Sequence, residues 1–126
     1  MKKLLMAVAF ALAAAAAPAI ASAADMGGAW AVDGAFSTMG IKFSLVCRFT
    51  QSGAKFSGPC KDPQQATPNA ASGAVNGANV EFVYDTVYMG VNLHMDYKGV
   101  VQPNGAISGG IDTGTVQGTF TAARTR

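Results

Sequence analysis

The sequence is poor in the residues on which most enzymes and nucleic-acid-binding proteins depend. Only 13% of its 126 residues are charged, and it contains one His and two Cys. It has no Arg run or basic patch of the kind that binds nucleic acid, and no glycine-rich loop that leads from a strand into a helix. The single His has no nucleophile at a matching position, and paired inward carboxylates are absent. We therefore expect no catalytic activity, no cofactor, no metal site and no nucleic-acid partner.

Long apolar runs are absent beyond the first 24 residues. Lys2 and Lys3 precede an apolar stretch, and Pro18 and a series of small residues follow it. This order is typical of a secretory signal peptide and predicts cleavage after Ala23 or Ala24. The alternative is a transmembrane anchor, because the stretch is close to the length that spans a bilayer. Pro18 and the small residues after it favour cleavage.

Removal of this leader, residues 1–24, leaves a single domain, residues 25–126, with balanced charge. Without Lys2 and Lys3 the nine basic side chains become seven, against seven acidic ones. No other segment is long and apolar enough to cross a bilayer. We expect a soluble exported protein, periplasmic or extracellular, with no membrane span in the mature chain.

The two cysteines, Cys47 and Cys60, are predicted to form a disulfide bond. Exported chains with an even number of cysteines usually pair them. The alternative is a metal pair, but the spacing is not Cys-x-x-Cys and only one His is present to complete such a site.

The remainder of the chain shows almost no helix pattern. Short runs of alternating polarity are separated by Gly and Asn turns, which is typical of an all-β domain. The expected strands are 28–36, 41–50, 55–60, 71–75, 78–88, 91–101, 106–112 and 115–123.

The turns predict the register of neighbouring strands. A two-residue turn at Met89-Gly90 sorts its hairpin into one apolar face and one polar face, and a register error of one residue would exchange the two. The expected pairs are Tyr84 with Met95 on the inner face, and Glu81 with Lys98 and Asp85 with His94 on the outer face.

The other turns give further pairs. A turn at Gly53-Ala54 places Cys47 opposite Cys60 and Phe49 opposite Gly58, and the pairing is expected to end at Pro59, which has no N–H. Asn76-Gly77 is a type I′ signal. The remaining expected pairs are Val75 with Ala78, Val101 with Ile107 across a Pro103-Asn104-Gly105 turn with Gly105 left-handed, and Ile111 with Val116 across Thr113-Gly114.

Eight sequential antiparallel strands with one apolar face must bury that face. A sandwich would do so, but a closed up-and-down barrel also removes the sheet edges, and we predict the barrel. Small inward residues would allow it to coil tightly: Gly58, Gly73, Gly99, Gly109 and Gly118.

The first and last strands carry a resemblance to a known group. Gly28-Ala29-Trp30 opens the first strand. Arg124 ends the last strand at a position whose side chain is expected to face inward, where it can cover the Trp30 ring. This pattern resembles the calycins, the group of lipocalins, avidins and fatty-acid-binding proteins. The resemblance implies that Trp30 and Arg124 close the barrel floor. Small exported bacterial metalloprotease inhibitors share this barrel type and one disulfide, whereas the biotin-binding set of avidins is not recognisable here.

Seven inward residues are the candidate ligand site. The last five of those named below lie toward the Met89-Gly90 turn, which is expected at the opposite end from Trp30. The alternative is that these residues form an ordinary filled core without a ligand site, since an eight-stranded barrel is just wide enough for its own side chains. The candidate site residues are Phe43, Leu45, Tyr84, Tyr88, Val91, Leu93 and Met95.

Our first hypothesis is an exported binding protein that holds a small, mostly apolar ligand. The second is a protein-binding module such as a protease inhibitor, which would insert its N-terminal segment, 25–28. The third is an envelope protein without a ligand. His94 is expected in a surface pair with Asp85, and a weak metal site with Asp85 and Asp96 is the lesser alternative.

Overall fold

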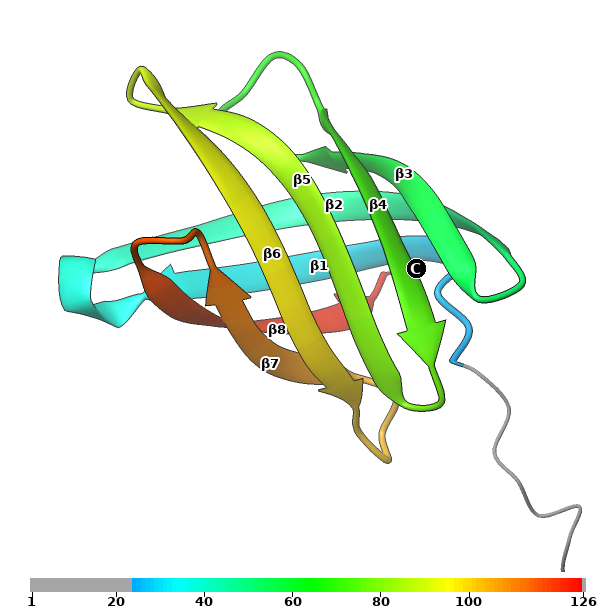
Figure 1. Cartoon of the computed structure of the whole chain (residues 1–126). Helices are drawn as coiled ribbons and strands as arrows, with labels where there is room; N and C mark the ends of the chain where they lie inside the picture. The colour runs from blue at the N-terminus through cyan, green and yellow to red at the C-terminus, as the bar shows by residue number, and fades with distance from the viewer. Residues whose placement is uncertain (1–23, 126) are drawn as a thin grey trace, which may run out of the picture.

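Eight strands follow one another around a closed barrel in the computed structural model of the protein, which describes residues 24–125 (Figure 1). Each strand pairs antiparallel with the next, and β8 pairs with β1 to close the ring. A 3-10 turn, η2 (Ser37–Met39), joins the first two strands. The predicted leader lies outside the described residues except for Ala24. The strands are β1 (Gly28–Phe36), β2 (Ile41–Ser52), β3 (Lys55–Lys61), β4 (Asn69–Asn76), β5 (Asn79–Tyr88), β6 (Val91–Val101), β7 (Ile107–Asp112) and β8 (Gln117–Arg124).

The alternation of side chains along each strand decides which residues enter the barrel. On β2, Leu45, Cys47 and Phe49 are buried, whereas Val46 and Arg48 between them are exposed. A strand presents successive side chains to opposite faces, so apolar residues at every second position form one continuous inner surface. The predicted closed up-and-down barrel is therefore confirmed.

The β5–β6 hairpin has the predicted register throughout. Tyr84 pairs with Met95 on the inside, and the outer face carries two charged or polar pairs. His94 Nδ1 lies 2.7 Å from Asp85 Oδ1, and the Lys98 amine lies 3.9 Å from the Glu81 carboxylate, all on exposed side chains. Such surface pairs contribute little stability individually, and their main consequence here is to keep the outer face polar.

Two predicted registers are wrong by two residues. Between β4 and β5 the loop is Gly77-Ala78 with Asn76 opposite Asn79, so Val75 pairs with Val80 and not with Ala78. Gly77 has φ +60° and is the one residue of this loop with a positive φ, which suits a turn with Gly in the first central position.

Between β7 and β8 the loop is four residues long, and Ile111 pairs with Gly118 and not with Val116. Side-chain hydrogen bonds stabilise this longer loop: Gly114 N–H donates to Asp112 Oδ1 (2.7 Å), and Val116 N–H donates to Thr113 Oγ1 (3.0 Å). Both errors shift the strand by an even number of residues, so every side chain keeps the face that was predicted for it.

The β2–β3 pairing has an interruption where the sequence predicted an end. Cys47 pairs with Cys60 as expected, and the two sulfurs are bonded at 2.04 Å. Pairing is absent at Pro59 and at Gly58 but resumes at Cys60 and Lys61. A Cβ on Gly58 would lie 1.8 Å from the Arg48 carbonyl oxygen, so the two backbones nearly touch at this point. The disulfide holds the strands together beyond the gap that Pro59 causes.

Aromatic rings fill one part of the barrel interior. The Phe82 and Tyr97 rings stack at 4.4 Å between centroids, and the Phe120 ring meets Tyr97 edge-on at 5.1 Å. Phe49 and Phe56 continue the cluster with centroids 4.8 Å apart. All five rings are buried, and edge-on or offset contacts of this kind stabilise a core beyond the burial of area alone.

Glycine at inward positions makes room for these rings. Gly99 pairs with Gly109, and a Cβ on Gly109 would lie 2.0 Å from the Lys98 carbonyl oxygen. A Cβ on Gly99 would lie 2.9 Å from the Phe120 ring. The other predicted small positions, Gly58, Gly73 and Gly118, are equally confined, with a backbone oxygen within 2.4 Å of each added Cβ.

Candidate functional site

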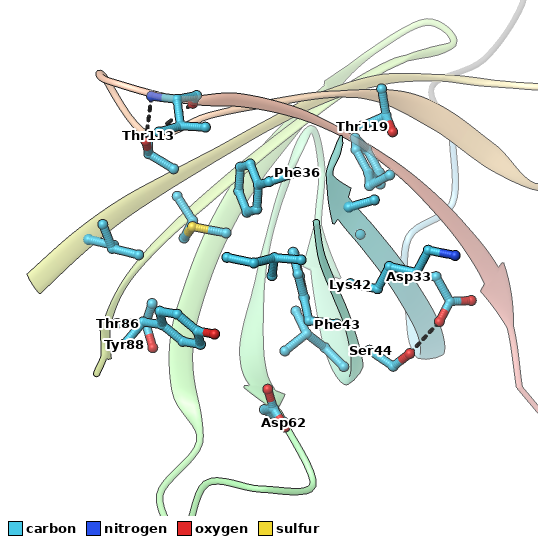
Figure 2. Close-up of a pocket in the computed structure, with 18 of the residues that line it drawn as sticks. Asp33, Phe36, Lys42, Phe43, Ser44, Asp62, Thr86, Tyr88, Thr113 and Thr119 are labelled. Carbon is cyan, nitrogen blue, oxygen red and sulfur yellow. Dashed lines mark hydrogen bonds between the residues drawn. The ribbon is translucent and has the colours of Figure 1, made fainter. Parts of the chain in front are cut away.

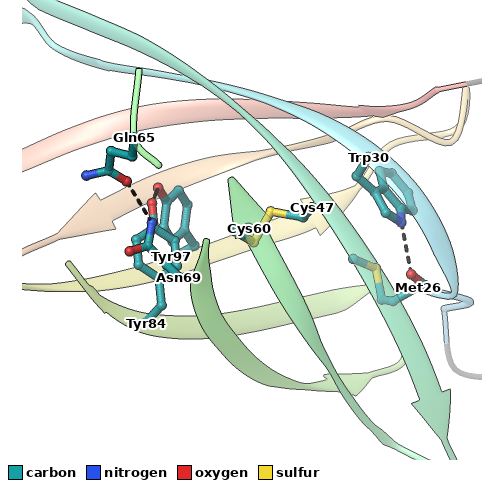
Figure 3. The surroundings of a disulfide bond; sticks show 8 residues. All are labelled: Met26, Trp30, Cys47, Cys60, Gln65, Asn69, Tyr84 and Tyr97. Carbon is teal, nitrogen blue, oxygen red and sulfur yellow. Dashed lines mark hydrogen bonds between the residues drawn. A yellow bond between two sulfur atoms is a disulfide. The ribbon is translucent and has the colours of Figure 1, made fainter. Parts of the chain in front are cut away.

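One end of the barrel is closed by Trp30. Its side chain is 2% exposed, and the Arg124 guanidinium carbon lies 4.6 Å from the centre of its ring. Trp30 Nε1–H donates a hydrogen bond to the Met26 carbonyl at 2.9 Å (Figure 3). Trp30 and Arg124 also pair directly across β1 and β8. The predicted contact at the barrel floor is therefore present.

The N-terminal segment forms the rest of this plug. Met26 is 1% exposed, and Gln51 binds the backbone on both sides, accepting from Met26 N–H and donating to the Ala24 carbonyl. Arg124 donates to the carbonyls of Asp25 and Gly27. The segment 25–28, which the second hypothesis treats as an inserting element, is thus bound to its own barrel.

The opposite end of the barrel opens into a cavity of about 1080 Å³. This end carries the β1–β2, β3–β4, β5–β6 and β7–β8 connections, as Figure 1 shows. The volume also counts a strip of the outer surface, because outward-facing residues such as Asp33, Ser44 and Thr121 border it together with inward-facing ones. The part of the cavity that lies inside the barrel is therefore smaller than 1080 Å³.

Six of the seven predicted site residues line this cavity and Val91 does not. The six come from β2, β5 and β6. Val91 is 57% exposed, and Tyr88, which pairs with it, is 47% exposed. The alternation rule assigns both residues to the inner face, but they flank the β5–β6 turn and are exposed, so they lie at the rim of the barrel. The six lining residues are Phe43, Leu45, Tyr84, Tyr88, Leu93 and Met95.

Two stacked rings cross the cavity. The centroids of Phe36 and Phe43 lie 5.9 Å apart, and the ring planes differ by 24°. The Phe43 ring occupies the space beside Gly34, where an added Cβ would lie 2.3 Å from it. Figure 2 shows both rings in the middle of the pocket, with Thr86 and Tyr88 on one side and the hydrogen-bonded pair Asp33 and Ser44 on the other.

The β3–β4 loop borders the mouth, and sequence reasoning missed it. Gln65 Nε2–H donates to Thr86 Oγ1 (3.3 Å) and to the Val87 carbonyl (3.2 Å), and Asn69 Nδ2–H donates to Gln65 Oε1 (3.3 Å). These bonds tie the loop to the end of β5. Asp62 in the same loop also lines the cavity. No periodic pattern in the sequence could indicate these contacts. Phe36 was also missed as a lining residue, although the alternation along β1 places it on the same inner face as Trp30.

Two tyrosine hydroxyls meet at the inner boundary of the cavity. The oxygens of Tyr84 and Tyr97 are 2.6 Å apart, and the side chains are 4% and 0% exposed. Burial raises the pKa of Tyr84 to about 12, against a smaller lowering by the Tyr97 hydrogen bond and a small raising by the Asp62 carboxylate. Burial also raises the pKa of Tyr97. Both phenols are therefore neutral across the physiological pH range. Tyr84 lines the cavity and Tyr97 does not.

Exposed apolar side chains lie at the β1–β2 and β5–β6 connections of this end of the barrel. Met39, Val87 and Met89 are 56%, 53% and 86% exposed. Met89 adopts φ +51° in the β5–β6 turn, the one positive φ at a residue other than glycine among residues 24–125. A non-glycine side chain in this conformation is strained.

Polar clusters elsewhere are small. His94 contacts Asp85, as predicted, and within the described part of the chain no three His, Cys, Asp or Glu side chains gather in a way that could hold a metal ion. Across residues 24–125 no helix has the length and hydrophobicity needed to cross a membrane. One buried oxygen, Asp96 Oδ1, has no hydrogen-bond partner there.

Comparison with protein-family models and with curated proteins found no match to this chain. The closed eight-stranded barrel is compatible with the calycin architecture that Gly28, Trp30 and Arg124 indicate.

Proposed function

We propose that the protein is an exported binding protein that holds a small, mostly apolar molecule in the open half of its barrel. The observation that carries this proposal is the contrast between the two ends. One end is sealed by Trp30, Met26 and Arg124, whereas the other is open and lined by Phe36, Phe43 and further apolar side chains. Concave, mostly apolar cavities with a few polar groups are the usual form of small-molecule sites.

The test is entry of a neutral fluorescent probe, N-phenyl-1-naphthylamine, into the cavity. We expect its emission to rise with the wild-type protein and to saturate. Leu93→Trp should abolish this rise, because Leu93 lines the cavity and the larger ring would occupy it. Val46→Trp is the matched control, since Val46 is exposed on the outer face of β2.

Each outcome bears on the proposal. Binding to the wild type and to Val46→Trp, with loss in Leu93→Trp, supports a site within the barrel. Equal binding to all three proteins places the probe elsewhere and contradicts the proposal. Absence of binding to the wild type contradicts the proposal and favours a protein-binding module or an envelope protein without a ligand.

Export can be tested through the mature N-terminus. Ala24 N–H donates to the Gly77 carbonyl at 3.0 Å, and Gln51 donates to the Ala24 carbonyl at 3.0 Å. Cleavage after Ala23 keeps both contacts, whereas cleavage after Ala24 removes them. We expect the mass of protein secreted with its own leader to correspond to a chain that starts at Ala24. An uncleaved chain in the cytoplasm would contradict export.

A further inference from the structure

We propose that the Tyr84–Tyr97 pair presents one hydroxyl proton to the ligand, so that the cavity selects a neutral apolar molecule with a hydrogen-bond-accepting oxygen. This inference rests on the proposed function, because it names the class of ligand for the same cavity. It disfavours two neighbouring classes: pure hydrocarbons, which offer no acceptor, and fatty-acid anions, which bring a negative charge.

The distance between the two tyrosine hydroxyls allows either of them to donate the hydrogen bond. Each hydroxyl can donate once and accept twice, and the pair at 2.6 Å uses one donor. Tyr97 is 0% exposed and does not line the cavity, and among the described residues Tyr84 is the one partner that its hydroxyl contacts. If Tyr84 donated, the Tyr97 proton would be buried without an acceptor, which is costly. Tyr97 is therefore the donor.

This direction leaves the hydroxyl proton of Tyr84 without an acceptor in the described part of the chain. Its oxygen accepts from Tyr97, so its own proton has no partner within residues 24–125 and is available on the cavity side. Figure 3 shows the two rings beside Asn69, whose amide donates to Gln65 and not to either phenol. Tyr84 thus offers a donor in a largely apolar enclosure, where a hydrogen bond is stronger than in water.

The charged side chains around the cavity disfavour an anionic ligand. Two acidic residues, Asp33 and Asp62, and one basic residue, Lys42, border the cavity. Asp33 and Lys42 belong to the outward phase of β1 and β2 and are exposed, and Figure 2 draws them next to one another, away from Tyr88. The Asp62 carboxylate is the one of these three charges that raises the pKa of Tyr84, and its effect is smaller than that of burial. A ligand carboxylate at Tyr84 would therefore meet a like charge and no cation, and an anion without a partner is costly to bury.

The experiment measures displacement of the fluorescent probe by four ten-carbon molecules at pH 8: decane, 1-decanol, 2-decanone and decanoate. We expect the alcohol and the ketone to compete about 3- to 10-fold better than decane, the range for one neutral hydrogen bond, and decanoate to compete worst. The ketone is informative because it only accepts. Tyr84→Phe should bring the ketone to the level of decane without changing decane itself.

Val46→Phe is the control, because Val46 is exposed on the outer face of β2 and does not line the cavity. It should keep the preference for the ketone. An independent readout is the infrared carbonyl band of bound 2-decanone labelled with ¹³C, which should lie at lower frequency in the wild type than in Tyr84→Phe. This readout does not depend on affinity.

The outcomes separate the two proposals. If the wild type does not bind the probe, the proposed function fails and this inference fails with it. If the probe binds but the ketone competes no better than decane, the binding function stands and the hydrogen-bond assignment is wrong. If decanoate competes as well as 1-decanol, the cavity accepts anions and the restriction to neutral ligands is refuted.

Discussion

Removal of the Arg124 side chain should loosen the closed end of the barrel. This residue makes three kinds of contact there. Its guanidinium lies over the Trp30 ring at 4.6 Å, donates to the carbonyls of Asp25 and Gly27, and approaches the Asp25 carboxylate at 3.9 Å. Arg124→Ala removes all of them and leaves the N-terminal segment without its ties to β8.

The magnitude follows from these contacts. An exposed cation–π contact contributes about 0.5–1 kcal/mol, and each hydrogen bond contributes about 0.5–1 kcal/mol where water can replace the lost donor. The Asp25 pair is counted as zero, because the Asp25 side chain is 84% exposed. The free energy of unfolding should therefore fall by about 2 kcal/mol in total. Arg124→Lys should lose about half as much, since Lys keeps the charge but not the planar fork.

Urea unfolding followed by the fluorescence of Trp30 measures this effect, because Trp30 is the one tryptophan of the sequence. The midpoint for Arg124→Ala should fall by about 1–2 M at the slope usual for small domains. Arg48→Ala, which changes an exposed residue on the outer face of β2, should unfold like the wild type. Equal midpoints for Arg48→Ala and Arg124→Ala would refute the assignment of a structural plug.

Three further predictions concern the rest of the barrel. Replacing both Cys47 and Cys60 by Ala should lower the free energy of unfolding by about 2–3 kcal/mol, because the bond closes a short loop; unchanged urea midpoints would contradict this. Met89→Asn should raise the free energy of unfolding by about 0.5–1 kcal/mol, because Asn tolerates a positive φ better than Met. A lower melting temperature for this variant would contradict the assignment of backbone strain at Met89. The pKa of Tyr84 is about 12 in the folded chain, compared with its ordinary value of 10.0. The stability that the neutral phenol contributes is therefore fully present below pH 10 and is lost as the pH rises from 10 to about 12. Tyr84→Phe should show a shallower decline over that range, and an identical profile would refute the shifted pKa.

The fold could be predicted from the sequence because its main signal survives small errors. Alternating polarity assigns each side chain to a face, and the turns at Gly77 and at Thr113 shift their strands by two residues without changing that face. The Cys47 and Tyr84 pairs were correct because the turns expected at Gly53-Ala54 and Met89-Gly90 are the turns that the structure has. The interruption at Pro59 could not be predicted in full, since nothing local shows that pairing resumes beyond it.

The candidate site could be predicted only where strands form it. Leu45, Leu93 and Met95 follow from inward phase alone, and the structure places all three on the cavity wall. Gln65 and Asp62 lie in an irregular loop whose path depends on hydrogen bonds to distant strands, and no short-range pattern encodes such a path. Val91 also has an inward position in the alternation, but it lies beside the β5–β6 turn, where it is 57% exposed and does not line the cavity.

The distribution of side-chain sizes explains why a barrel of this width has a cavity at all. Eight strands normally enclose just enough space for their own inward side chains. Here the rings of Phe49, Phe56, Phe82 and Tyr97 are buried together and none of them lines the cavity. Toward the mouth the inward positions of β5 and β6 include Thr86 and Leu93, whose side chains fill less volume than these rings. The open space therefore depends on which residues occupy the inward positions toward the mouth. A larger side chain at one of these positions, as in Leu93→Trp, should close the cavity. The tightly packed aromatic cluster and the plug at Trp30 should keep the barrel of this variant folded.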